Sequence, residues 1–328
     1  MARRVGLLLA ALLSWPAPCV AQPTIWQRTE NPDTQRAYDL LTVVEQKLEQ
    51  SVGPFDLLEL HRSYGEIVAL LEGNQALSLP DPRLWYLVAD VYSNSSVGRY
   101  RDARRAVEQA LAAAPESPSA DRGWFLLGLA CDKLGDTDCS NRAYTRALGR
   151  AYDRNFRANI FLNRGESNMG LGELEMALAD ARQAVRLATR MDLLSLAYYD
   201  LGIALERSGD LPQALVAMRR ARANWPALAP FSALDQPDVF FVPSFEIYYY
   251  KALEKMALAQ LFARDHDYEQ EQRYLRGAID NWTDYLAAAE PEGHEYVSNA
   301  KLHRKACVRD LNRSMARAAS HRSEPRSR

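Results

Sequence analysis

Side chains that carry out chemistry in enzymes are present in this sequence, but their spacing matches no catalytic pattern. Five histidines are scattered along the chain, and only His266 lies between two carboxylates, in the tripeptide Asp265-His266-Asp267. Three consecutive side chains point in different directions, whereas a metal ion needs ligands that converge. We therefore interpret the tripeptide as a polar turn that caps a helix.

The common active-site signatures are also absent from the sequence. It has no G-x-S-x-G, no P-loop, no H-E-x-x-H and no G-x-G-x-x-G. Paired carboxylates occur throughout an acidic helical chain and therefore carry no specific signal. We predict no catalytic residues, no metal site and no cofactor, and we expect that the protein is not an enzyme.

The first twenty-one residues have the pattern of a secretory signal peptide. The basic pair Arg3-Arg4 precedes an apolar run at 5–13, and small residues precede Gln22. The run is about half the length that crosses a bilayer. We expect cleavage after Ala21 and export, to the periplasm or alternatively out of the cell. No later run is long and apolar enough to predict a transmembrane span.

Composition and charge exclude several classes of protein. The chain of 328 residues is 48% hydrophobic and 25% charged, which is too apolar for a disordered chain. Its net charge of −2 argues against a nucleic-acid binder, which usually carries a basic excess. The charge is unevenly placed, because residues 22–312 carry −8 and residues 313–328 carry +4. We expect the basic end, 313–328, to be a disordered tail.

A repeat of 37 residues organises the middle of the chain. A small residue recurs at this step, and a glycine precedes it by five positions. The small residues are Ala103, Ser140, Ala177 and Ala214. Seven to nine residues before each glycine stands another small residue, and these are Ala89, Gly128, Gly165 and Gly202. Two small residues facing each other let the helices of a hairpin approach closely, and a single hairpin cannot bury its apolar face without neighbours.

This pattern resembles the tetratricopeptide repeat (TPR) family, whose signature is W-x2-L-G-x2-Y followed by A-x3-F and P. The fourth repeat matches best, from Tyr198, Leu201 and Gly202 to Ala214 and Pro226. The sequence departs from the family in its step of 37, which exceeds the usual 34, and in Arg164, which stands where the third repeat should have a large apolar residue. The chain also resembles exported TPR proteins of Gram-negative bacteria, in the residues Phe241-Val242-Pro243, Tyr248-Tyr249-Tyr250, Trp282, Tyr285-Leu286 and Pro291.

The resemblance implies an all-α fold, a right-handed α-solenoid of antiparallel helix pairs (a TPR superhelix) with divergent end caps. The expected segments are a signal peptide at 1–21, capping helices at 22–80, and four repeats at about 82–117, 121–154, 158–191 and 195–228, which together fill 82–228. After them we expect a Pro- and Phe-rich connection at 229–244, a divergent helix pair at 245–291, a capping helix at 294–312 and the tail at 313–328.

In the TPR family, the first helices of the repeats line a concave surface that binds a partner segment. Carried over position by position, the resemblance implies a partner-binding groove whose lining is acidic with several aromatic rings. The predicted groove residues are Tyr86, Asp90, Phe125, Leu129, Asp132, Asn163, Glu166, Tyr199, Asp200 and Ile203. An acidic lining favours a neutral or basic extended segment of another exported protein. Two alternatives remain: these residues form a solvated face, or the connection at 229–244 covers them.

The sequence therefore predicts a non-enzymatic protein–protein interaction scaffold of the bacterial cell envelope. The alternative is a structural or assembly factor associated with the cell wall or outer membrane through the basic tail. Cys131 and Cys139 stand on either side of one repeat's turn, where an oxidising compartment would allow a disulfide. The other interpretation is a pair of small buried thiols.

Overall fold

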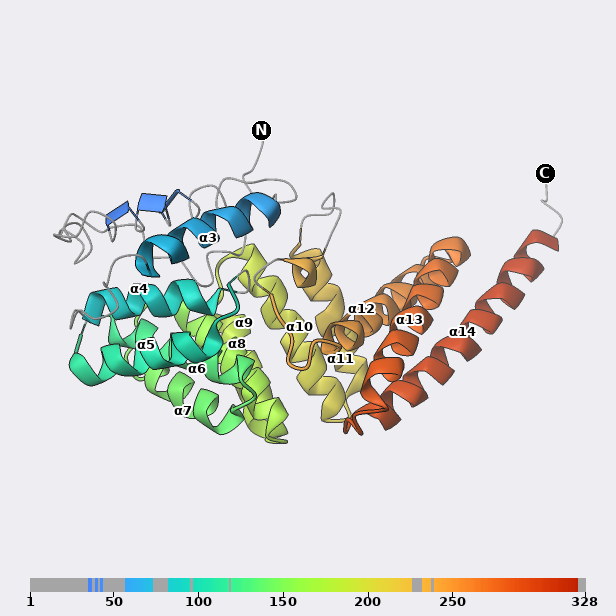
Figure 1. Ribbon diagram of the computed structural model, residues 1–328. Coiled ribbons are helices and arrows are strands. Elements are labelled where there is room, and N and C mark those ends of the chain that lie inside the picture. Colours follow the sequence, from blue (N-terminus) through green and yellow to red (C-terminus); the bar gives the residue numbers. More distant parts are fainter. Residues whose placement is uncertain are drawn as a thin grey trace. The chain divides into compact units, whose positions relative to one another are not determined.

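The computed structural model describes residues 35–36, 39–40, 42–43, 57–72, 82–94, 97–117, 119–225, 232–236 and 239–323. Within these residues the chain is all-α, as predicted, and consecutive helices pack as antiparallel pairs (Figure 1). The signal peptide at 1–21 and most of the predicted caps at 22–80 lie outside the described residues. No helix in the described part is long and apolar enough to cross a membrane.

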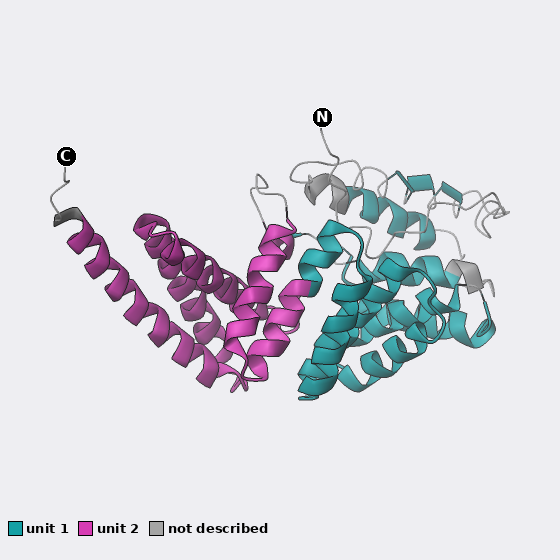
Figure 2. Ribbon diagram, turned by 180° about the vertical axis from the view of Figure 1, so that it is seen from behind, with its two compact units in different colours: residues 1–197, 236–238 teal, residues 198–235, 239–328 magenta. Residues whose placement is uncertain are grey.

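The chain divides into two compact units, which Figure 2 colours separately. The first unit comprises residues 1–197 with 236–238, and the second comprises 198–235 with 239–328. The helices are α3 (Leu57–Glu72), α4 (Pro82–Ser93), α5 (Tyr100–Ala113), α6 (Ala120–Lys133), α7 (Thr137–Leu148), α8 (Arg154–Gly170), α9 (Leu174–Leu187), α10 (Met191–Arg207), α11 (Leu211–Ala223), α12 (Glu246–Arg264), α13 (Tyr268–Ala289) and α14 (Val297–Ser323), with a short 3-10 turn at Ala233–Asp235.

The turn inside each helix pair explains where the recurring glycine stands. Gly98, Gly135, Gly172 and Gly209 all have positive φ angles, between 66° and 89°. Glycine adopts this left-handed conformation without steric cost, so it can end one helix and reverse the chain. In the pair α12–α13 the same position is filled by His266, with φ of 58°. His266 is therefore a turn residue, as the sequence suggested.

Aspartates after two of these glycines, Gly135 and Gly209, cap the second helices. The side chain of Asp136 accepts a hydrogen bond from the Cys139 amide, and that of Asp210 accepts one from the Gln213 amide. Asp267 caps α13 in the same way through Gln270. A capping aspartate is worth about 1 kcal/mol of helix stability. The carboxylate beside His266 thus has a structural role.

The step of 37 residues exceeds the usual TPR step of 34 partly because α8 and α10, the first helices of the third and fourth repeats, begin about one turn before their predicted starts. Both helices have 17 residues, whereas α6 has 14. Helix α8 starts at Arg154 because Asp153 caps it by accepting a hydrogen bond from the Phe156 amide at 2.7 Å. The added turn precedes the start of the third repeat that the sequence predicted at 158.

The end of the last helix differs from the prediction. Helix α14 continues to Ser323, so placing its end at 312 and a disordered tail from 313 was wrong. The additional turns are held because the buried carboxylate of Glu271 on α13 accepts hydrogen bonds from Ser314 at 2.7 Å and from Arg317 at 2.6 Å. Several alanines in this stretch also favour a helix.

Candidate functional site

The aromatic residues predicted for the groove are buried in helix interfaces. In the first unit, Tyr86 is 5% exposed and its ring packs against Gly123 of α6. Phe125 is 1% exposed, and its ring centre lies 5.9 Å from that of Tyr144 and 5.4 Å from that of Phe156. These rings hold neighbouring helices together. They offer almost no exposed surface to a partner, which corrects their placement in the lining of the groove.

Leu129 in the first unit and Tyr199 and Ile203 in the second are buried as well, with exposed fractions of 5% or less. All three lie on the first helix of a pair. The exposed fraction of a side chain depends on helix packing and was not visible in the repeat pattern.

The polar residues predicted in the first unit keep part of their surface. Asp90 and Arg122 form an ion pair at 3.0 Å, and each side chain is 14% exposed. Burial raises the pKa of Asp90, and Arg122 opposes that rise. Asn163 is half-buried and its side-chain amide donates to the Asn159 carbonyl at 2.8 Å. Glu166 is also half-buried.

Lys133 lies among these acidic groups. Burial lowers the pKa of Lys133 to about 8, although Glu166 and Asp132 favour its charged form. Its ammonium group also lies 5.5 Å from the centre of the Tyr100 ring. Together with Arg122, Lys133 offsets much of the negative charge that the sequence alone suggested for this surface.

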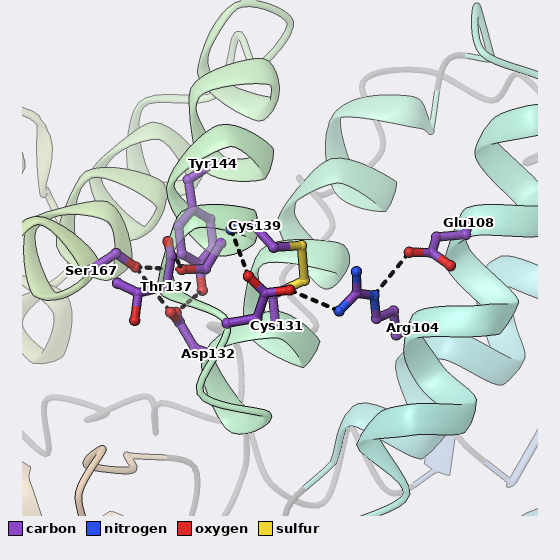
Figure 3. Close-up of a disulfide and its surroundings, with 10 residues drawn as sticks. Arg104, Glu108, Cys131, Asp132, Thr137, Cys139, Tyr144 and Ser167 are labelled. Atoms are coloured by element: carbon purple, nitrogen blue, oxygen red, sulfur yellow. Dashed lines mark hydrogen bonds and ion pairs between the residues drawn. A yellow bond between two sulfur atoms is a disulfide. The ribbon is translucent and has the colours of Figure 1, made fainter. Parts of the chain in front are cut away.

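Asp132 is half-buried and belongs to a polar network between two helix pairs. Its carboxylate accepts hydrogen bonds from the hydroxyl groups of Tyr144 at 2.6 Å and Ser167 at 3.0 Å. The Ser140 and Ser167 hydroxyl oxygens lie 3.0 Å apart. Burial raises the pKa of Asp132, and the hydrogen bonds to its carboxylate counteract this. Figure 3 shows that these side chains converge on the carboxylate.

The unexpected Arg164 has a partner in the next helix. Its guanidinium donates two hydrogen bonds to Asp180, at 2.9 and 2.7 Å, and the Asn168 amide donates a third at 3.0 Å. The side chain of Asp180 is only 5% exposed. A bidentate ion pair therefore replaces the apolar contact that the third repeat lacks.

Asp200 is buried in the second unit, and the hydrogen bond to its carboxylate offsets little of the cost of burying it. It is 8% exposed and accepts a hydrogen bond from the Tyr250 hydroxyl at 3.2 Å. Burial raises the pKa of Asp200 to about 7, against the opposing effects of Tyr250 and Arg207. Asp200 is therefore a buried group and not an exposed acidic contact.

Sequence reasoning missed a dense polar cluster in the second unit. The carboxylate of Glu206 accepts hydrogen bonds from Tyr249 at 2.6 Å and Asn299 at 3.1 Å, and its other neighbour is His303 at 2.7 Å. Burial would raise the pKa of Glu206, but these hydrogen bonds outweigh it and hold the pKa below its usual value. Glu206 stands at the same position in its repeat as Asp132. This shared acidic position is the feature of the sequence that could have indicated the cluster.

A buried ion pair lies next to this cluster. Arg207 donates to Glu246 at 2.5 Å, and both side chains are less than 10% exposed. The guanidinium carbon also lies 3.9 Å from the centre of the Tyr296 ring. His294 hydrogen-bonds to the Tyr285 hydroxyl at 2.8 Å and faces Glu246 at 3.4 Å. These contacts connect α10, α12, α13 and the segment just before α14.

The two cysteines of the second repeat form a disulfide, which is one of the two alternatives that the sequence left open (Figure 3). Cys131 on α6 and Cys139 on α7 have Cα atoms 5.8 Å apart. Asp136, in the turn between them, also accepts a hydrogen bond from Arg104 at 3.0 Å.

Among the described residues Cys307 is free and buried, and burial raises the pKa of its thiol to about 12.

A small cavity of about 230 Å³ lies between α12, α13 and α14. Met256, Leu275 and Cys307 form part of its wall, together with the Glu271 carboxylate. Because Ser314 and Arg317 already satisfy that carboxylate, the cavity presents no buried group that calls for a ligand.

Comparison with known proteins shows that this chain is similar in fold to several solved structures. No protein-family model and no curated protein matches the chain. Among solved structures, YrrB, described as a TPR protein with an unusual peptide-binding site, is 18% identical with a TM-score of 0.41, covering 60% of this chain and 87% of its own. The C-terminal part of a TPR protein from Cytophaga hutchinsonii is 17% identical with a TM-score of 0.44, covering 78% and 92%.

PilW, described as a widely conserved type IV pilus biogenesis factor, is 16% identical with a TM-score of 0.48, covering 76% of this chain and 92% of its own. The chain has the TPR fold, which rests on its own 37-residue repeat, its antiparallel helix pairs and the left-handed turn residue within each pair.

Proposed function

We propose that the protein is a non-enzymatic scaffold for protein–protein interaction. The observation that carries this proposal is the arrangement of polar, partly exposed side chains on successive first helices of the first unit. They are Asp90 on α4, Asp132 on α6, and Asn163 and Glu166 on α8. Stacked helix pairs present such side chains at regular intervals, which suits an extended partner segment.

The same side chains define the chemistry of the proposed partner. Carboxylates accept hydrogen bonds from backbone amides and attract cations, while the amide of Asn163 both donates and accepts. Arg122 and Lys133 offset part of the negative charge of this surface. The proposed occupant is therefore an extended, neutral or weakly basic segment of another exported protein.

The surface can be tested with side chains whose removal should leave the fold intact. We expect the double variant Asn163→Ala with Glu166→Gln to reduce partner recovery from envelope extracts at least tenfold, because residues central to an interface contribute about 2 kcal/mol or more. The matched control is Glu175→Gln, which neutralises an exposed carboxylate on the second helix α9. Equal recovery with the double variant and the control would rule this surface out.

We also propose that the chain is exported to the periplasm. The support is the disulfide between Cys131 and Cys139, since such bonds persist in oxidising compartments. We expect N-terminal sequencing of protein from the envelope fraction to begin at Gln22, and non-reduced digests to contain the Cys131–Cys139 linked peptide. Protein in the cytosolic fraction that still begins at Met1, with both thiols free, would contradict the proposal.

A further inference from the structure

The last helix carries a regular line of positive charge. Lysine or arginine occurs at every fourth position along α14, and these residues are Lys301, Lys305, Arg309, Arg313 and Arg317. Residues four apart lie one turn apart on nearly the same face. The line extends over about 24 Å, from the rise of 1.5 Å per residue. We call these five residues the α14 basic stripe.

The α14 basic stripe is exposed and only partly neutralised. The side chains of Arg309 and Arg313 are 60% and 68% exposed, and they share the carboxylate of Asp310 at 3.3 and 3.6 Å. Lys301 pairs with Glu290, and Arg317 pairs with Glu271. Within the described residues, Lys305 is exposed and forms no ion pair. Like charges one turn apart repel, so an external anion would stabilise this face.

Three large apolar side chains are exposed on the same helix. Leu302 is 66% exposed, Val308 is 42% exposed and Met315 is 49% exposed. By helix geometry Leu302 and Val308 lie on either side of Lys305, each about 60° away around the axis, whereas Met315 lies on the side opposite Arg313 and Arg317. Cations mixed with exposed apolar side chains on one helix are typical of helices that lie on a lipid surface.

The opposite face of α14 is fixed within its unit. Ala300, His303, Cys307 and Ser314 are at most 6% exposed, and Ser314 hydrogen-bonds to Glu271 on α13. Packing against α13 therefore orients the helix so that Lys301, Lys305 and Arg309 face away from the core of the unit, whereas Arg313 and Arg317 lie beside the cavity between α12, α13 and α14. A surface bound by the stripe would meet a preformed helix, with no ordering cost for the backbone.

We propose that the outer face of α14 binds an anionic lipid surface. The stripe drifts around the helix by about 40° for every four residues, from the geometry of 3.6 residues per turn. Fluid lipid headgroups can rearrange to meet such a drifting line, whereas a folded acidic protein would need its carboxylates at matching positions. Leu302 and Val308, which flank Lys305, would then enter the boundary between headgroups and acyl chains. The proposal does not depend on the partner surface of the first unit.

The test is sedimentation of the full chain, without residues 1–21, with vesicles of equal parts phosphatidylglycerol and phosphatidylcholine. We expect binding at low salt that weakens as salt rises, and no binding to pure phosphatidylcholine. Each lysine or arginine near an anionic surface is worth about fivefold in partitioning. The double variant Lys305→Gln with Arg309→Gln should therefore bind about 25-fold more weakly.

The control variant removes the same charge elsewhere. Arg182 and Arg186 are exposed and one turn apart on α9, so Arg182→Gln with Arg186→Gln should leave vesicle binding within about twofold of the original. Far-UV circular dichroism would check that both variants stay folded. The lipid proposal is overturned if both variants lose binding equally, or if immobilised poly-glutamate captures the chain while anionic vesicles do not. Loss of lipid binding with unchanged partner recovery would separate it from the scaffold function.

Discussion

Replacing Gly128 by alanine is expected to lower the free energy of unfolding by about 3 kcal/mol. A Cβ atom at this position would lie 2.3 Å from Cε1 and 2.5 Å from Cδ1 of the Tyr144 ring. Tyr144 is fully buried, and its hydroxyl donates to Asp132 at 2.6 Å. The ring cannot move away without stretching that hydrogen bond, so overpacking and a weakened buried polar contact add together.

Gly165 provides a matched control because it occupies the same position in the next repeat. A Cβ there would lie 3.5 Å from the Asp180 Cβ and 3.6 Å from the Ala177 oxygen, which are ordinary contacts. Gly165→Ala should therefore be neutral or stabilising by up to about 1 kcal/mol, since alanine is the better helix former. Urea unfolding followed by circular dichroism would measure both. Equal destabilisation by the two variants would contradict the packing argument.

Replacing Asp200 by asparagine is expected to stabilise the protein at pH 8 by an amount on the order of 3 kcal/mol. Burial raises the pKa of Asp200 from 3.8 to about 7. Between these two values the folded chain binds a proton that the unfolded chain does not. The favourable contribution of the protonated side chain is thus fully present below about pH 4 and is lost as the pH rises through 7.

Asparagine keeps an oxygen that can accept the Tyr250 hydrogen bond but carries no charge at any pH. The gain in stability should therefore be large at pH 8 and small at pH 4, as measured by thermal unfolding at both values. Glu206→Gln is the contrasting variant, because the pKa of Glu206 is held low and its carboxylate accepts hydrogen bonds from Tyr249 and Asn299. We expect Glu206→Gln to lower the free energy of unfolding by about 3 kcal/mol at pH 8. If Asp200→Asn also lowered the free energy of unfolding at pH 8, ionised Asp200 would be stabilising, and the argument from its raised pKa would be contradicted.

The repeat pattern predicted the helix pairs because their requirements are local. A left-handed turn residue, a capping aspartate and facing small residues each leave a signature within one repeat, as at Gly135, Asp136 and Ser140. The fifth pair was harder to align because His266 replaces the glycine and the connection before Glu246 breaks the 37-residue step.

The candidate site was predicted less well because exposure depends on neighbours. Tyr86 is covered because α6 has a glycine, Gly123, opposite its ring, and nothing in the sequence of α4 indicates that pairing. The last helix extends past 312 because Glu271, more than forty residues earlier, holds Ser314. Such long-range side-chain pairs appear only when the helices are placed together.

The network around Asp132 also bears on how such a chain can change during evolution. Tandem repeats are readily duplicated or deleted, yet the carboxylate of Asp132 depends on a hydroxyl from the following pair, that of Ser167. At the equivalent position the other repeats carry Val91, Ala130 and Ala204, which supply no donor side chain. Exchanging the third repeat for a copy of another would leave the half-buried carboxylate of Asp132 short of a hydrogen bond. We therefore expect the second and third repeats to tolerate duplication or exchange better as a unit than separately.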